Sequence, residues 1–323
     1  MIIENKLREK AKKLLSELDL IIGYAPGSDQ LKVSPVFIEA ADDTEKMIFN
    51  KFCINNLATY SYFLSNQIKG KFGIILKPCD IKSIIQLISE GLLVRDRINI
   101  IAVGCSGIID YKKIAKEIPG AKITYAGIEN GNLIINTSDK TFELKPENFY
   151  ADKCYTCKIY DKPIIYDEFI ENDKKPDILL REEYEDIDNF EKLNSNEINN
   201  YWDIQFSRCI RCYACRNICP LEICKDKCIS QLDEPHWQSQ KINSTEGKFF
   251  QLIRVMHLAG RCTECGECER VCPMNIPVLK LMKKVNKEIN RLFNFKPGIS
   301  IDDKPPLLTF KNIEKNIDEE KLI

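Results

Sequence analysis

Hydrophobic and polar positions near the start of the chain follow a helical period, then a strand period, then a helical period again. Over residues 5–18, leucine and alanine recur every three or four residues with charged residues between them, which predicts an amphipathic helix. Short apolar runs at 20–24 and 31–38 flank a Gly-Ser-Asp turn and predict two strands. The pattern over 47–64 predicts a second helix.

Two strand-loop-helix units of the same design follow. Residues 72–77 and 98–103 are short apolar runs that predict buried strands. The helices predicted after them cover 81–91, with Asp80 as the N-cap, and 108–117. Apolar strands that alternate with helices are typical of a parallel sheet with helices on both faces. The first part of the chain is therefore predicted to be an α/β domain with a mainly parallel sheet.

Each of these two loops carries a cysteine at the point where its strand ends. Cys79 follows the first strand and Cys105 follows the second. Because the carboxyl ends of parallel strands meet at one edge of a sheet, we expect the two residues to lie close together, where helix N-termini offer free N–H groups to ligands. Contact with a cofactor, metal ligation and a purely structural role in a tight loop all remain open for them.

The rest of the chain divides by composition. Residues 121–145 predict a hairpin with turns at Asn130-Gly131 and Ser138-Asp139, and 167–200 is acidic, rich in asparagine and typical of a solvated linker. The predicted organisation is an α/β domain at 1–150, a segment with a cysteine pair and the linker at 151–205, a mainly α-helical ferredoxin domain at 206–292 and a surface tail at 293–323.

Composition and charge exclude several classes of function. The 323 residues carry a net charge of -1, so the chain has no electrostatic attraction for nucleic acid or anionic lipid. No apolar run approaches the roughly 20 residues of a membrane helix, and the N-terminus lacks a signal-peptide core, which predicts a cytoplasmic protein without membrane insertion. In a reducing cytosol, 15 cysteines indicate metal binding or catalysis rather than disulfides. His236 and His257, the only histidines, are expected to be structural.

The strongest chemical signal is a doubled Cys-x2-Cys-x2-Cys-x3-Cys-Pro run in the last third of the chain. In such runs, three thiolates bind one 4Fe-4S cluster and the fourth binds the other cluster. Zinc knuckles pair two Cys-x2-Cys units and do not require this third and fourth cysteine, so two 4Fe-4S clusters are predicted. The ligands are Cys209, Cys212, Cys215 and Cys272 for cluster 1, and Cys262, Cys265, Cys268 and Cys219 for cluster 2.

The spacer between the two runs is much longer than in small bacterial ferredoxins. It predicts a helix over 249–258, and another helix is predicted over 277–290 after the second run. This layout resembles the α-helical ferredoxin fold of the iron-sulfur subunits of succinate dehydrogenase and of heterodisulfide reductase. The Met and aromatic positions of the spacer are expected to belong to the core.

Two further cysteine pairs lie just outside the α/β domain and just after the first run. Cys154-x2-Cys157 and Cys224-x3-Cys228 could converge on one metal, and we predict a third 4Fe-4S cluster there. Zinc binding and unligated thiols are the alternatives. Cys53 stands alone and is expected to be a small buried residue.

Several stretches together resemble one family, the beta subunits of coenzyme F420 (deazaflavin) hydrogenases and formate dehydrogenases, in a version with a C-terminal dicluster module. The resemblance covers about residues 45–290. The stretches that carry it are Lys77-Pro78-Cys79-Asp80, Val103-Gly104-Cys105-Ser106-Gly107, Cys154-Tyr155-Thr156-Cys157, Phe206-Ser207-Arg208-Cys209 and His257-Leu258-Ala259-Gly260-Arg261-Cys262.

The resemblance implies an FAD on the α/β domain that exchanges two electrons with a soluble redox coenzyme. It also implies that the clusters pass single electrons to a catalytic oxidoreductase subunit of a larger complex. The residues expected to contact the cofactor are Lys77, Cys79, Asp80, Cys105, Ser106 and Gly107. The second hypothesis is an electron-transfer adaptor subunit without flavin. No catalytic residue is predicted in either case.

Overall fold

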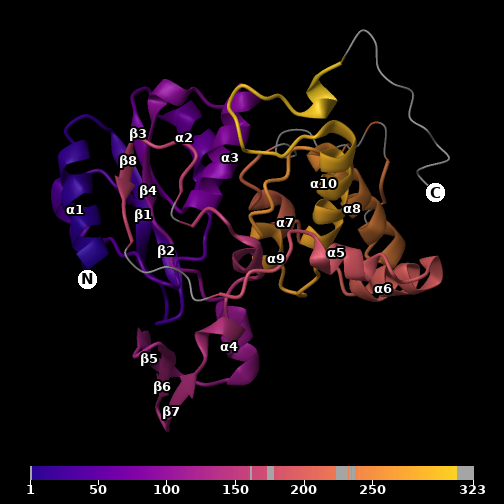
Figure 1. Cartoon of the computed structure of the whole chain (residues 1–323), viewed down its shortest axis with the longest axis horizontal. Helices are drawn as coiled ribbons and strands as arrows, with labels where there is room; N and C mark the ends of the chain where they lie inside the picture. Colours follow the sequence, from indigo (N-terminus) through magenta and orange to yellow (C-terminus); the bar gives the residue numbers. More distant parts are fainter. Residues whose placement is uncertain are drawn as a thin grey trace.

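The computed structural model describes residues 2–160, 162–172, 178–222, 232, 234, 237–239 and 241–310. Figure 1 shows a sheet flanked by helices next to a group of helices, with a small second sheet that projects from the body of the molecule. The predicted α/β sheet and the predicted helical region that follows it are both present.

The main sheet has five strands in the order β2-β1-β3-β4-β8. Neighbours β1, β3, β4 and β8 run parallel, and β2 runs antiparallel to β1 at one edge. Every side chain of β3 is buried, as expected for a central parallel strand covered on both faces. The strands are β1 Leu20–Pro26, β2 Val33–Ile38, β3 Phe72–Leu76, β4 Ile98–Val103 and β8 Glu168–Ile170.

Helices cover the two faces of this sheet. Helix α1, Ile2–Leu14, lies on one side and helix α3, Pro78–Ser89, lies on the other (Figure 1). Leu7 and Ala11 of α1 are fully buried, which confirms the amphipathic pattern read from the sequence. The same hydrophobic core continues into the helical region through Trp202 and Val255, so the two parts share one core.

The helix predicted over 47–64 is wrong. The structure has short 3-10 turns, η1 Ala41–Lys46 and η2 Leu57–Tyr60, and only then helix α2, Ser61–Gln67. Asparagine side chains explain the break, because the side-chain oxygen of Asn50 accepts a hydrogen bond from the Phe52 N–H at 2.9 Å and that of Asn56 accepts one from the Ala58 N–H at 3.0 Å. Such local bonds compete with helix hydrogen bonds. Cys53 in this stretch is fully buried, as predicted.

Helix α3 begins earlier than predicted, and Asp80 is not its N-cap. Lys77 occupies the cap position and Pro78 the first helical position, where its missing N–H costs no hydrogen bond. The Asp80 carboxylate instead pairs with Lys77 inside the protein. The next helix, α4, covers only Tyr111–Glu117, with Asp110 as its N-cap.

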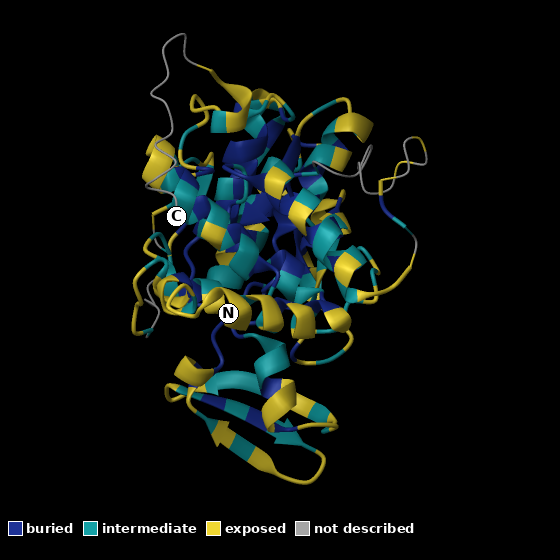
Figure 2. Ribbon diagram, turned by 90° about the vertical axis from the view of Figure 1, so that its right-hand side faces the viewer, coloured by how far each residue is buried: buried dark blue, intermediate teal, exposed yellow. Residues whose placement is uncertain are grey.

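The segment predicted as a hairpin forms a three-stranded antiparallel meander. Its strands, β5 Ile123–Glu129, β6 Asn132–Thr137 and β7 Thr141–Leu144, turn at the two predicted places. Figure 2 shows that this small sheet, apart from a few buried positions, is largely exposed or half-buried. The buried positions include Leu133 and Ile135 of β6.

The segment predicted as an acidic linker contributes regular structure. Residues of β8 extend the main sheet by pairing with β4, and residues 185–207 form two helices. Asp167 explains the strand, because its carboxylate accepts a hydrogen bond from the Ile100 N–H at 2.7 Å and pairs with Arg95.

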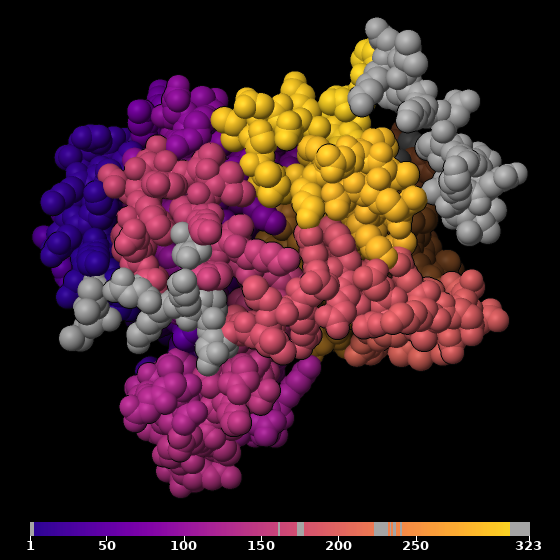
Figure 3. All heavy atoms as spheres, viewed as in Figure 1, coloured from indigo at the N-terminus to yellow at the C-terminus, as the bar shows by residue number. Residues whose placement is uncertain are grey.

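The helical region is built from six helices among the described residues, and it lies on the α3 side of the sheet (Figure 1). In the space-filling view its atoms adjoin those of the α/β part (Figure 3). The six helices are α5 Glu185–Phe190, α6 Ser195–Ser207, α7 Ala214–Asn217, α8 Ser244–Leu258, α9 Glu267–Arg270 and α10 Leu279–Phe293. Helices α8 and α10 correspond to the two helices predicted from the long spacer and the following segment. Within the described residues, no helix is long and apolar enough to cross a membrane.

The tail after 293 packs back onto the α/β part. The Gly298 N–H donates a hydrogen bond to the side-chain oxygen of Gln86 on α3 at 3.0 Å. Gly298 has a φ of +70°, and a Cβ there would lie 2.4 Å from the Lys82 carbonyl oxygen, so only glycine fits this approach. A surface path for this tail was predicted, and the structure shows it as far as residue 310.

Candidate iron-sulfur centres and the adjoining crevice

The two cysteine runs fold into loops with the same backbone. Each run has residues with positive φ at equivalent positions: Arg211 and Glu264, Tyr213 and Gly266, and Glu222 and Asn275. Five of these six are not glycine, and such residues adopt this conformation rarely. Each loop then enters a four-residue helix, α7 or α9. A repeated, sparsely populated conformation around cysteines is typical of a ligand clamp.

The structure brings together the four thiols predicted for cluster 1. Cys209, Cys212 and Cys215 of the first run and Cys272 of the second line one cavity with Phe250 and Met274. The crossing of Cys272 from the other run is the arrangement predicted from spacing alone.

The four thiols predicted for cluster 2 lie within electrostatic reach of one another. Burial raises the pKa of the Cys265 thiol to about 12, and Glu267 and Cys219 raise it further. Burial also raises the pKa of Cys262, and the neighbouring Cys268 and Cys265 add to that rise. Buried thiols that repel one another in this way need a metal to become thiolates.

Arg254 on helix α8 lies between the two sets of thiols. Only 3% of its surface is exposed, and its Nη1 atom has no hydrogen-bond partner among the described residues. Burial opposes its charge, but Cys268, Cys215 and Cys219 outweigh burial and raise its pKa. A buried cation is costly unless a negative group is present. Anionic clusters on these thiols supply that group, so the residues fit two 4Fe-4S clusters. Sequence reasoning missed Arg254, because a single arginine in a helical pattern carries no signal.

A second cavity lies in the α/β part, at the carboxyl edge of the sheet. It is lined by four cysteines and by small or apolar neighbours, including Pro78, Gly107 and Ile108. The cysteines are Cys79, Cys105, Cys154 and Cys157. The predicted proximity of Cys79 and Cys105 is confirmed, and the pair Cys154-x2-Cys157 joins them.

Local hydrogen bonds explain this convergence. The Ala151 N–H donates to the Ile108 carbonyl at 2.8 Å, which brings the segment of Cys154 beside the loop of Cys105. The Cys105 N–H donates to the Tyr160 carbonyl at 2.9 Å. Gly107, with φ +88°, leaves no room for a Cβ, which would lie 2.6 Å from the Tyr150 ring. Each of these contacts joins residues that are more than 40 positions apart, so no local pattern could reveal them.

The four thiols of this cavity influence one another. Burial raises the pKa of Cys105 to about 12, and Cys154 and Cys157 add to the rise. Burial likewise raises the pKa of Cys79, with Asp80 and Cys157 contributing. Thiols are the donor groups that 4Fe-4S clusters and zinc use in proteins.

Among the other residues predicted to contact a cofactor, Lys77 and Asp80 lie behind this cavity, where Asp80 accepts a hydrogen bond from Cys79 at 3.7 Å. Lys77 and Asp80 are fully buried and form an ion pair with 2.6 Å between Nζ and Oδ2. Lys77 also donates to the Tyr24 hydroxyl at 2.7 Å. Neither side chain has exposed surface in the structure. Ser106 is half-buried, and its carbonyl accepts a hydrogen bond from Lys51.

Lys153 connects the cavity of the α/β part to the ferredoxin loops. Its ammonium lies 3.2 Å from the Asp80 carboxylate. Its pKa is raised because Asp80, Cys79, Glu267 and Cys265 outweigh the effect of burial. One cation thus lies between the four-cysteine cavity and a predicted ligand of cluster 2.

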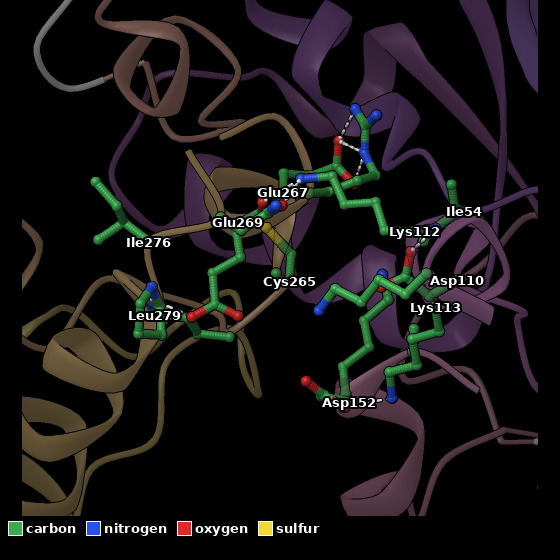
Figure 4. A pocket seen from close by; sticks show the side chains of 17 residues that line it. Ile54, Asp110, Lys112, Lys113, Asp152, Cys265, Glu267, Glu269, Ile276 and Leu279 are labelled. Atoms are coloured by element: carbon green, nitrogen blue, oxygen red, sulfur yellow. Dashed lines mark hydrogen bonds and ion pairs between the residues drawn. The ribbon is translucent and has the colours of Figure 1, made fainter. Parts of the chain in front are cut away.

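An open crevice lies on the same side, between the α/β part and the second cysteine run. Figure 4 shows Cys265 on its wall, with Lys112 and Lys113 on the side of α4 and Glu269 on the ferredoxin side. The Lys112 ammonium donates to the Cys272 carbonyl at 2.9 Å and to the Asn275 side chain at 3.0 Å. Further lining residues include Ile54, Lys116, Ile276, Pro277 and Leu279.

Three predicted residues remain to be placed. Cys224, Cys228 and His236 lie outside the described residues. His257 lies on α8 and is half-buried, with its carbonyl bound by Arg261.

Comparisons with known proteins agree with this chemistry. The model of a 4Fe-4S dicluster domain matches residues 205–276. The F420-dependent formate dehydrogenase subunit beta of Methanocaldococcus jannaschii is 24% identical over an alignment that covers 94% of this chain and 92% of that protein. The F420-dependent formate dehydrogenase 1 subunit beta of Methanococcus maripaludis is 23% identical over 90% of this chain and 89% of that protein.

A third relative shares a shorter region. It is a subunit of the ion-translocating oxidoreductase complex of Buchnera aphidicola, and it is 28% identical over 35% of this chain and 20% of that protein. The predicted resemblance is thus confirmed over most of the chain, and the dicluster domain gives its last third the chemistry of iron-sulfur electron transfer.

Proposed function

We propose, from this resemblance to beta subunits of formate dehydrogenases, that the chain is the iron-sulfur electron-transfer subunit of an oxidoreductase complex. It would relay electrons between a soluble two-electron carrier and a catalytic partner subunit. The observation that carries the proposal is the four-cysteine cavity of the α/β part, joined to the dicluster domain by Lys153. This arrangement gives the α/β part a place in the electron path rather than a purely structural role.

A third 4Fe-4S cluster is part of the proposal, with ligands that differ from the set predicted from sequence. Its ligands are Cys79, Cys105, Cys154 and Cys157. Cys154 and Cys157 are kept from the predicted set, and the two cysteines that follow strands β3 and β4 replace Cys224 and Cys228. The enclosed cavity and the mutual influence of the thiols support this choice.

Two cations connect the three sets of thiols. Lys153 lines both the α/β cavity and the crevice that Cys265 lines, and Arg254 interacts with Cys268 and Cys219 of predicted cluster 2 and with Cys215 of predicted cluster 1. When bound, the clusters accept and release single electrons. The two cations favour the more negative, reduced state of their neighbours, because a buried positive charge stabilises added negative charge.

We further propose that FAD binds in the crevice beside Cys265. Lys116 would hold a phosphate there, and Ile276 and Pro277 offer apolar contacts. FAD converts two-electron into one-electron transfer.

The alternative, a flavin-free adaptor subunit, is favoured by the burial of Lys77 and Asp80, two of the residues first expected to contact the flavin. Acid treatment of protein purified anaerobically from its native source decides between the two. Release of one flavin per chain, reduced strongly by Lys116→Glu, supports the crevice. A colourless supernatant from protein with full iron content contradicts the flavin and leaves the relay intact.

The relay itself is tested by its metal content. Protein purified anaerobically should contain about twelve irons and twelve sulfides per chain, as three 4Fe-4S clusters require. An iron content of about eight atoms per chain would contradict the third cluster. Zinc in place of iron would contradict electron transfer as the function.

A further inference from the structure

The two cysteine runs are related by an offset of 53 residues, and their equivalent positions have opposite environments. The second run packs against the α/β part. Arg261 pairs with Glu90 at the end of helix α3, and the Thr263 hydroxyl lies 3.0 Å from that of Ser83 on the same helix. Cys265 faces the crevice between the two parts (Figure 4).

The first run presents the equivalent positions to solvent. Arg208, the counterpart of Arg261, is exposed, and its guanidinium donates a hydrogen bond to the side chain of Gln205. Ile210, the counterpart of Thr263, is 49% exposed, whereas Thr263 is 7% exposed. Cys212, the counterpart of Cys265, is the one exposed cysteine among the described residues.

Charge also reverses between the two runs. Glu264 and Glu269 of the second run correspond to Arg211 and Arg216 of the first. The second run meets the α/β part through Arg261, which pairs with Glu90, and through the backbone carbonyl of Glu269, which the Lys112 ammonium binds at 3.2 Å. Oppositely charged surfaces guide association and fix orientation. The first run carries the same backbone with arginine at these two positions. Its described contact with the α/β part is made away from them, by the Thr59 hydroxyl, which donates to the Ile218 carbonyl at 3.0 Å.

Nearby acidic groups do not cancel this charge. Asp203, on the helix that leads into the first run, already pairs with Lys248 at 2.7 Å and accepts a hydrogen bond from Ser244 at 2.9 Å. Arg216 stacks over the Tyr213 ring, with 5.3 Å to its centroid, and binds the side chain of Asn217. The charges of Arg208 and Arg216 are therefore not paired with a carboxylate in any contact of the described residues.

We propose that this exit face, formed by Arg208, Ile210, Cys212 and Arg216, is the docking surface for an acidic redox protein that exchanges electrons with this chain. It is the counterpart of the face that the second run uses to bind the α/β part. The proposal rests on the proposed electron-transfer function. The step moves one electron from the reduced chain to the oxidised acceptor, and no bond forms or breaks.

The test compares two acceptor proteins of opposite charge. Chemically reduced full-length protein, freed of excess reductant, is mixed with ferric rubredoxin, an acidic one-iron protein, or with a basic ferric cytochrome c. Each electron received converts one ferric acceptor to the ferrous form, which is followed by absorbance. We expect faster reduction of rubredoxin than of cytochrome c at low salt, and a rate for rubredoxin that falls as salt rises.

Charge-reversal variants locate the surface. Arg208→Glu combined with Arg216→Glu should slow rubredoxin reduction at least about tenfold and speed cytochrome c reduction, because the sign of the steering field reverses. Lys13→Glu, an exposed lysine of helix α1, is the matched control and should leave both rates unchanged. Iron content and the reduced-cluster signal are measured in every variant to show that the clusters are retained.

The outcomes separate the two proposals. Two results overturn the exit face and leave the proposed electron transfer standing. In the first, both acceptors are reduced but the double variant changes neither rate. In the second, Lys13→Glu changes the rates as much as the double variant does. Reduction of neither acceptor by fully loaded protein overturns the proposed function and the docking surface with it. If the double variant loses iron, the single variant Arg208→Glu, which lies outside the cysteine loop, is tested in its place.

Discussion

The two cysteine runs of the dicluster domain have the same spacing and the same unusual backbone, but different surroundings. The second run is acidic and packs on the α/β part, whereas the first run is basic and presents Cys212 to solvent. The motif fixes which cysteines bind a cluster. The residues between the cysteines fix the surroundings of each site, so two equal clusters would have different roles in the proposed relay.

The largest expected difference between the two runs is between Cys265, which lies at the contact with the α/β part, and Cys212, which is exposed. Cys265→Ser and Cys212→Ser should each lower the iron content by about four atoms. Only Cys265→Ser should also loosen the contact with the α/β part, because Cys265 lies at that contact. Iron analysis and thermal unfolding check this, and an equal fall in the unfolding temperature for both variants would show that the two environments are equivalent.

The ion pair between Arg261 and Glu90 tests the packed side directly. The Glu90 side chain is 2% exposed and that of Arg261 is 18% exposed. Glu90→Gln should lower the free energy of unfolding by about 3 kcal/mol, since it leaves a largely buried cation unpaired. The equivalent arginine on the exposed side gives the control: Arg208→Gln should change it by no more than about 0.5 kcal/mol. Denaturant unfolding under anaerobic conditions measures both, and comparable losses would contradict the contrast.

Arg254 lies between the two runs and should affect both clusters. Arg254→Met should lower both reduction potentials, because a buried positive charge is lost. The expected shift is about 60 mV, which corresponds to a tenfold change in the equilibrium constant of a one-electron couple. Arg254→Lys should restore most of the shift. Redox titration followed by electron paramagnetic resonance gives the values, and a shift confined to one cluster would place Arg254 beside that cluster alone.

The smallest expected effect concerns the hydroxyl contact of Thr263. Thr263→Val removes its hydrogen bond to Ser83 and should lower the free energy of unfolding by about 1 kcal/mol. Ile210→Val at the equivalent exposed position should have almost no effect, since half of its surface is already in water. A loss at Ile210 as large as that at Thr263 would mean that the exit face is covered in solution.

The sequence predicted the chemistry of this chain better than its local structure. The spacing of eight cysteines was sufficient to assign Cys272 to the thiols of the first run, because the fourth cysteine of such a run reaches across to the other cluster. The strands that precede Cys79 and Cys105 were also predictable, since both are continuous apolar runs.

The rest depended on contacts between distant residues. Cys154 and Cys157 meet Cys79 and Cys105 through loops that cross more than 40 positions of the chain, and two cysteines in sequence do not reveal their partners. The apolar pattern favoured a helix over 47–64, but hydrogen bonds from the backbone to side chains such as that of Asn50 replace the helix hydrogen bonds there.

The central claim is that the α/β part carries a cluster of its own, on Cys79, Cys105, Cys154 and Cys157. The most direct measurement is the iron content and reduced-cluster spectrum of Cys79→Ser beside Cys228→Ser, both purified anaerobically. We expect Cys79→Ser to lose about four irons and one reduced-cluster signal. We expect Cys228→Ser to keep all of its iron. Loss of iron in Cys228→Ser with full retention in Cys79→Ser would contradict the central claim.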